Sequence, residues 1–155
     1  MESGHFRPPP PRGTTVPIPA VDYAHIRLTV RDIAVSRAFY DSVFGFDVAY
    51  EAPPADAPEE QKEQLAFLFG GLIYKFPGGL LGLRPVADAG DRFDEDRVGL
   101  DHLSFAVADI DALKSAAAAL DELGIAHEPI KDTGGESILE FRDPDNIALE
   151  ITSPS

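Results

Sequence analysis

The chain has 155 residues and a formal net charge of −14, because 27 Asp and Glu outnumber 13 Lys and Arg. An acidic surface repels nucleic-acid phosphates and anionic lipid headgroups, so we expect neither a nucleic-acid nor a membrane partner. No apolar run approaches the roughly 20 residues of a membrane-spanning helix. The sequence has no Cys, which excludes disulfides and thiolate chemistry and is compatible with the cytoplasmic location that we expect.

The composition changes along the chain and suggests four segments. Residues 1–20 contain six Pro, which is typical of a disordered or extended arm. Residues 87–98 are rich in Asp and Glu and resemble a linker. The stretches on either side of this linker, 21–86 and 99–155, are expected to be two modules that together form one domain.

These two modules are related by an internal repeat. The segment from His25 to Ile33 aligns without a gap with the segment from His102 to Ile110, at an offset of 77 residues. His, Val, Asp and Ile occupy identical positions in both copies. Self-similarity over half the chain is the mark of a duplicated structural unit.

Each copy predicts the same order of elements: strand, helix and three strands. Apolar residues alternate after each His, which is typical of a half-buried strand. Asp32 and Asp109 then stand where helices begin, and Gly45 and Gly124 where they end. We therefore predict an α+β fold of two tandem βαβββ modules. The first module has a helix over 33–44, strands over 46–51, 64–76 and 80–86, and an exposed loop over 52–63. The second has a helix over 110–123 and strands over 126–131, 136–142 and 146–152.

Strand parity places three potential metal ligands on the non-core faces of their strands. Glu150 lies opposite the apolar residues Leu149 and Ile151, and His25 and His102 each lie opposite the apolar face that follows them. Two imidazoles and a carboxylate suit Fe, Mn, Zn, Ni or Co and leave coordination positions open. An ion pair between Glu150 and the imidazoles is the alternative.

With its paired His residues, its repeat and its closing FRDPDNIALEI segment, the chain resembles the vicinal oxygen chelate superfamily. This group includes glyoxalase I, fosfomycin-resistance proteins, extradiol dioxygenases and bleomycin-binding proteins. The resemblance covers about residues 22–153. It implies that the modules form a U-shaped mixed sheet around a metal-binding cavity, with His25, His102 and Glu150 as ligands of a divalent metal ion. By the repeat, Gly82 occupies the slot where glyoxalase I usually has a fourth ligand.

Other residues are weaker candidates for the cavity. Arg27 shares the face of His25, and His127 is the spare histidine that an extradiol-type oxygenase would need for acid–base chemistry. Tyr74, Arg84 and Lys131 are further candidates for binding an anionic substrate, although each is more often an ordinary strand residue. The phenylalanines are expected in the core instead of against a ligand: Phe67, Phe69, Phe105 and Phe141.

The resemblance favours a metal-dependent enzyme, either a dioxygenase or a glyoxalase or lyase type, acting on a small oxygen-rich organic substrate by bidentate chelation to the metal. The alternative is a non-catalytic protein that binds a bleomycin-type antibiotic, for which the acidic charge is favourable. We expect a homodimer, because half-open sheets leave edges to be covered. The cavity is formed either within one chain or between two chains.

Overall fold

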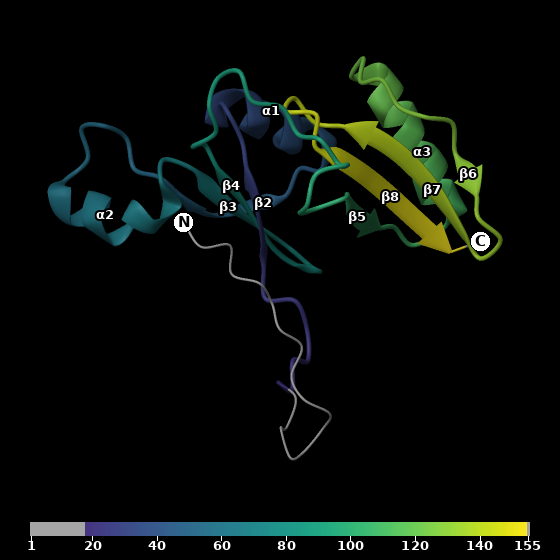
Figure 1. The fold of residues 1–155 in the computed structure, drawn as a ribbon, viewed down its shortest axis with the longest axis horizontal. Helices are drawn as coiled ribbons and strands as arrows, with labels where there is room; N and C mark the ends of the chain where they lie inside the picture. The colour runs from purple at the N-terminus through teal and green to yellow at the C-terminus, as the bar shows by residue number, and fades with distance from the viewer. Residues whose placement is uncertain (1–17, 155) are drawn as a thin grey trace.

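The computed structural model describes residues 18–154, which form two four-stranded mixed sheets (Figure 1). The sheets have the strand orders β1-β4-β3-β2 and β5-β8-β7-β6. The α+β fold of two tandem βαβββ modules is therefore confirmed. The elements of the first module are β1 (Ile26–Thr29), α1 (Ile33–Val43), β2 (Asp47–Glu51), α2 (Glu59–Gln64), η1 (Ala66–Leu68), β3 (Leu72–Phe76) and β4 (Gly79–Arg84). Those of the second are β5 (Leu103–Ala106), α3 (Ile110–Glu122), β6 (Lys131–Asp132), β7 (Glu136–Arg142) and β8 (Ala148–Pro154).

The two main helices begin and end where the sequence predicts. The carboxylate of Asp32 accepts hydrogen bonds from the backbone N–H groups of Ala34 and Val35, and Asp109 caps α3 in the same way. Gly45 and Gly124 follow the helices with φ of 59° and 68°, the left-handed region that glycine tolerates best. Both helices therefore end in tight turns that return the chain to the sheet.

The first strand of each module lies at a sheet edge and pairs in parallel with the last strand of the same module. β1 pairs with β4, and β5 pairs with β8. One face of each sheet packs against its helix, with Leu28 and Leu83 buried in the first module and Leu139 and Leu149 in the second. Residues at the alternate positions consequently lie on the opposite face of each sheet, where the candidate ligands are found.

Three stretches differ from the sequence prediction. The predicted loop 52–63 contains part of α2, and the predicted strand 64–76 begins only at Leu72, after η1. Glu59 and Glu60 occupy the first turn of α2 and Lys62 its last turn, so this charged run complements a helix dipole. Similarly, the predicted strand 126–131 is reduced to a bridge between His127 and Phe141 followed by β6.

The DPDN turn before β8 joins the second module to the first. The hydroxyl of Tyr40 on α1 donates to Asp143 at 3.1 Å, and Arg31 Nε donates to Asp145 at 2.5 Å. Asp143 and Asp145 are buried. Burial raises the pKa of Asp143 to about 6, although backbone N–H groups of Ile147 and Asp145 hydrogen-bond to its carboxylate. The turn thus fixes the second module against helix α1.

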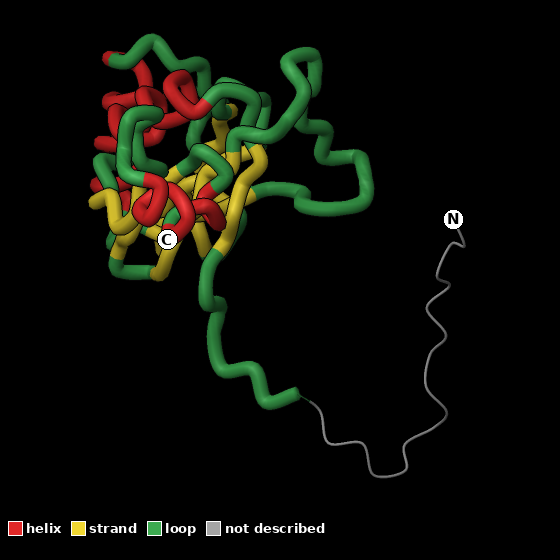
Figure 2. Tube along the Cα trace, turned by 90° about the vertical axis from the view of Figure 1, so that its left-hand side faces the viewer, coloured by secondary structure: helices red, strands yellow, loops and turns green. Residues whose placement is uncertain are grey.

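The predicted arm 1–20 lies mostly outside the described residues. From residue 18 to 24 the chain runs away from the body of the molecule (Figure 2). Ile18, Val21 and Tyr23 are 90%, 97% and 85% exposed. No helix among residues 18–154 is long and apolar enough to cross a membrane.

Candidate metal centre

The second module brings His102 and Glu150 together on the face of its sheet away from α3. His102 precedes β5, and Glu150 lies on β8 with Ser104 as its register partner. The imidazole Nε2 of His102 is 3.9 Å from Glu150 Oε1. The alternation of β8 leaves Glu150 half-buried, since Leu149 and Ile151 take the core side. One strand pair therefore supplies two of the three predicted ligands.

Neighbouring side chains hold both groups in orientation. Asp101 Oδ1 lies 2.5 Å from Nδ1 of His102, so the ring keeps its proton on that nitrogen and exposes Nε2 toward Glu150. The hydroxyl of Thr152 donates to Glu150 Oε1 at 2.9 Å and is itself 2.7 Å from the hydroxyl of Ser104. The hydrogen bond to Asp101 raises the pKa of His102, and the nearby charge of Glu150 adds to this effect.

Charged side chains surround the pair in a small hollow of about 90 Å³. Glu95 forms an ion pair with Arg142, which lowers the pKa of Glu95 to about 2. Glu140 is the register partner of Glu150 on β7 and binds Lys131 Nζ at 2.5 Å. The sequence analysis did not identify Asp101, Glu95, Glu140 or Arg142. Asp101 could have been identified because it directly precedes His102 in the sequence. Glu140 could have been identified because the alternation along β7 places it opposite the apolar residues Leu139 and Phe141.

The third predicted ligand, His25, is exposed and immediately precedes β1 in the first module. Within residues 18–154 of one chain, no three His, Asp or Glu side chains gather closely enough to hold a metal ion. A single chain therefore assembles the pair of His102 and Glu150 and does not bring His25 to it.

The donor set of His102 and Glu150 nevertheless fits a divalent metal ion. A neutral imidazole with a carboxylate on its other nitrogen is the usual state of a metal-binding His. Donor atoms that share one first-row metal ion are roughly 3 to 3.4 Å apart. The observed 3.9 Å is close to this separation, so a small side-chain rotation brings both atoms within reach of one ion.

Two weaker candidates lie on the helix side of their sheets. Tyr74 is fully buried, and its hydroxyl donates to Asp41 of α1 at 2.7 Å. His127 contacts Asp121 of α3 through Nε2 at 3.3 Å, and its register partner is the core residue Phe141. The structure brings neither side chain to the face that carries Glu150. Lys131 does reach that face, where it is paired with Glu140.

Arg27 lies on the non-core face of the first sheet and covers Gly82, its register partner on β4. A Cβ atom at position 82 would lie 2.9 Å from Arg27 Cγ. The guanidinium donates to the carbonyl of Phe67 at 2.7 Å.

The prediction that Phe67 and Phe69 belong to the core was wrong, because they are 46% and 53% exposed.

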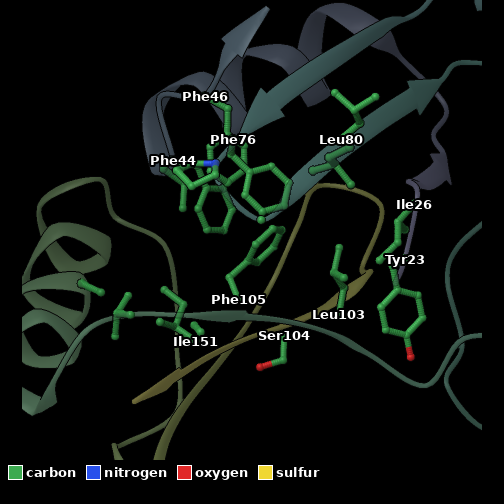
Figure 3. A pocket seen from close by; sticks show the side chains of 17 residues that line it. Tyr23, Ile26, Phe44, Phe46, Phe76, Leu80, Leu103, Ser104, Phe105 and Ile151 are labelled. Atoms are coloured by element: carbon green, nitrogen blue, oxygen red, sulfur yellow. The ribbon is translucent and has the colours of Figure 1, made fainter. Parts of the chain in front are cut away.

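A cavity of about 720 Å³ lies between the two modules, and neither His102 nor Glu150 lines it. Figure 3 shows Phe44, Phe46 and Phe76 of the first module facing Phe105 of β5 across this space. The centroids of Phe44 and Phe105 are 4.6 Å apart. Its lining side chains are mostly apolar and include no carboxylate, imidazole or ammonium group.

The geometry agrees with comparisons to known proteins. Residues 22–151 match the model of the Glyoxalase/Bleomycin resistance protein/Dioxygenase superfamily, and the chain belongs to this family. It is 32% identical over 129 residues to the uncharacterized protein YaeR of Escherichia coli strain K12, covering 82% of this chain and 92% of YaeR.

Solved structures of the same fold are also similar. One is a glyoxylase/bleomycin resistance protein/dioxygenase domain from Frankia sp. EAN1pec, with a TM-score of 0.69, 29% identity and coverage of 88% of this chain and 93% of that one. Another is a variant of the fosfomycin resistance protein FosX from Listeria monocytogenes, complexed with Mn(II) and 1S,2S-dihydroxypropylphosphonic acid. It has a TM-score of 0.65, 17% identity and coverage of 89% and 94%.

Proposed function

We propose that this protein is a metal-dependent enzyme that acts on a small, oxygen-rich organic substrate. In this proposal, His102 and Glu150 of one copy and His25 of a second copy hold the divalent metal ion of a homodimer. The observation that carries the proposal is the 3.9 Å approach of His102 Nε2 to Glu150 Oε1, with Asp101 and Thr152 orienting the two side chains.

A second copy is the natural source of the third ligand for two reasons. The described part of one chain gathers no three-ligand group, yet His25 is exposed on the first module and free to approach a neighbour. The repeat also relates the two modules, so a twofold axis can place the open face of the first module of one copy over the second module of the other. Each dimer would then contain two equivalent sites.

A divalent metal ion held by His102, Glu150 and the second copy's His25 would supply a Lewis acid that stabilises negative charge developing on two adjacent substrate oxygens. The chain's own residues would orient the substrate and exclude water around Glu150. Among residues 18–154, His127 is the one histidine that is not a proposed metal ligand. It contacts Asp121 on the helix side of the sheet, so it does not supply an acid–base imidazole at the proposed site. This favours isomerase or lyase chemistry over extradiol-type oxygenation. The FosX complex with Mn(II) and a dihydroxyphosphonic acid supports chelation of an oxygen-rich molecule by this fold.

Metal content tests the proposal directly. Protein is offered Fe(II), Mn(II), Zn(II), Ni(II) and Co(II), desalted, and measured by elemental analysis. We expect one metal ion per chain in the wild type and loss of metal in His102→Ala and Glu150→Gln. His127→Ala is the matched control and should retain metal. Absence of stoichiometric metal in the wild type with all five ions would overturn the proposal.

Mixing two variants that do not bind metal tests whether His25 comes from the same copy as Glu150 or from the second copy. His25→Ala and Glu150→Gln homodimers should each fail to bind Mn(II). After subunit exchange, sites shared between copies predict Mn(II) at about a quarter of all sites, because each mixed dimer regains one intact site. A cavity built within one chain predicts no recovery, and a monomer in sedimentation would contradict the shared site as well.

The alternative function is sequestration of a cationic, bleomycin-type drug without catalysis. The net charge of −14 and the apolar cavity between the modules favour this function. It requires binding of bleomycin to metal-free protein that is unchanged by His102→Ala, whereas the enzyme proposal predicts no such binding.

A further inference from the structure

The structure contains a pair of arginines that share one aromatic ring. The guanidinium carbon of Arg84 lies 4.3 Å from the centroid of Phe69, and that of Arg27 lies 5.7 Å from it. Both arginines occupy the non-core face of the first sheet, on the neighbouring strands β1 and β4. Two like charges beside one ring repel each other, and an anion bound near both of them would offset that repulsion.

No carboxylate within residues 18–154 forms an ion pair with either arginine. By contrast, Arg31, Arg37 and Arg142 each bind Asp or Glu side chains within the described chain. In addition, Arg27 Nε is buried and makes no hydrogen bond in this region. In a chain with 27 acidic residues and 13 basic ones, two adjacent arginines without a carboxylate form a local site of positive charge.

The backbone holds the shared ring in an unusual conformation. Phe69 follows η1 with a φ of 53°, a left-handed conformation that is unfavourable for a bulky side chain. The residue is 53% exposed and contributes little to the core. The backbone strain therefore keeps an aromatic surface beside the two cations, and the carbonyl of Phe67 fixes Arg27 at 2.7 Å.

The position of these residues relates them to the proposed metal site. Arg27 follows His25 by two residues, so their Cα atoms are roughly 7 Å apart along the extended chain. Gly82, under the Arg27 side chain, leaves the space that Cγ, Cδ and Nε of this arginine occupy. A ligand that reached the metal at His25 would extend past Arg27 toward Arg84 and Phe69.

We propose that Arg27 and Arg84, positioned by Phe69, form an anion-binding subsite that takes a carboxylate or phosphonate group of the substrate. The N–H groups that these guanidiniums leave free would donate hydrogen bonds to such a group, and Phe69 would stack on the adjoining part of the molecule. The subsite rests on the proposed function for its role in substrate selection, but its binding of an anion does not require the metal.

Calorimetric titration of the full chain in EDTA tests the subsite, with phenylphosphonate and benzoate as probes and the neutral benzyl alcohol as a reference. We expect the wild type to bind at least one of the two anions and not benzyl alcohol. Arg27→Met and Arg84→Met should each weaken binding at least about tenfold. Arg97→Met, which removes the same charge from an exposed position, is the matched control and should bind as the wild type does. Arg27→Lys should be intermediate, because a point charge lacks the planar fork.

The outcomes separate the subsite from the metal site, because metal binding is measured separately on the same protein preparations without EDTA, with the five ions offered in the metal-content test. Wild type that binds Mn(II) but neither anion would overturn the subsite and leave the proposed function standing. Wild type that binds an anion but none of the five metal ions would overturn the proposed function and leave the subsite standing. Equal anion affinity in Arg27→Met, Arg84→Met and Arg97→Met would attribute binding to overall charge and overturn the subsite. Circular dichroism of each variant confirms that it is folded.

Discussion

Asp101 Oδ1 lies 2.5 Å from Nδ1 of His102, so the imidazole presents Nε2 to Glu150. Removing the carboxylate in Asp101→Ala frees the ring to rotate and to change tautomer. We expect Mn(II) affinity to fall about 10- to 100-fold, as measured by titration calorimetry. Asp88→Ala, an exposed carboxylate of the segment between the modules, should leave the affinity unchanged. If both variants bound Mn(II) equally weakly, the effect would be one of net charge.

The side chain of Arg27 fills the space above Gly82 on the non-core face of the first sheet. In Gly82→Ala the new Cβ would lie 2.9 Å from Arg27 Cγ, so the flexible arginine side chain has to move. We expect phenylphosphonate binding to weaken while Mn(II) binding persists, since position 82 carries no ligand. Gly90→Ala, where a Cβ would meet nothing within 4 Å, serves as the control. Unchanged anion binding in Gly82→Ala would contradict the position assigned to Arg27.

Gly71 has a different role, because it lies directly against the backbone of β4. A Cβ there would be 1.9 Å from the carbonyl oxygen of Leu83, which cannot move without breaking the sheet. We expect Gly71→Ala to destabilise the protein by at least about 3 kcal/mol in urea unfolding. Gly135→Ala, with no neighbour within 4 Å, should change stability by less than about 1 kcal/mol.

The pKa of Asp143 is raised to about 6 by burial, above the value of about 3.9 for Asp in an unfolded chain. Between these values the folded state binds more protons than the unfolded state, so this residue makes stability fall as the pH rises from 4 to 6. The loss is about 3 kcal/mol at most. In Asp143→Asn, which keeps an acceptor for the N–H groups, this decrease should disappear. Urea unfolding at pH 4, 5, 6 and 7 measures it, and parallel curves for both proteins would exclude Asp143 as the source.

Local sequence signals predicted most of the fold. Asp32 and Asp109 cap their helices as expected, and β7 has the predicted bounds of 136–142. Helix α2 was missed because the acidic run after Pro58 was interpreted as solvated loop, although its charges are ordered as in a helix. The edge strand β6 is shorter than predicted because only Lys131 and Asp132 form a continuous ladder with β7, whereas His127 forms an isolated bridge to it.

The candidate site was predictable only in part. Parity on β8 placed Glu150 correctly opposite its apolar neighbours, because strand alternation is a local property. The contacts of Phe69 with Arg27 and Arg84 depend on the left-handed backbone at the end of η1, and no local pattern indicates that conformation for a phenylalanine. The separation of His25 from His102 is a property of how two modules are arranged, which a repeat in the sequence does not specify.

The turn containing Asp143 and Asp145 makes the duplicated modules unequal. Its two carboxylates bind Tyr40 and Arg31 of the first module, whereas the corresponding turn between β3 and β4 is Pro77-Gly78 and has no acidic side chain. The second half therefore makes contacts that the first half does not reciprocate. A dimer of two first modules would lack the two carboxylates, and a dimer of two second modules would lack Tyr40 and Arg31. A symmetric pair of either module therefore could not form these contacts.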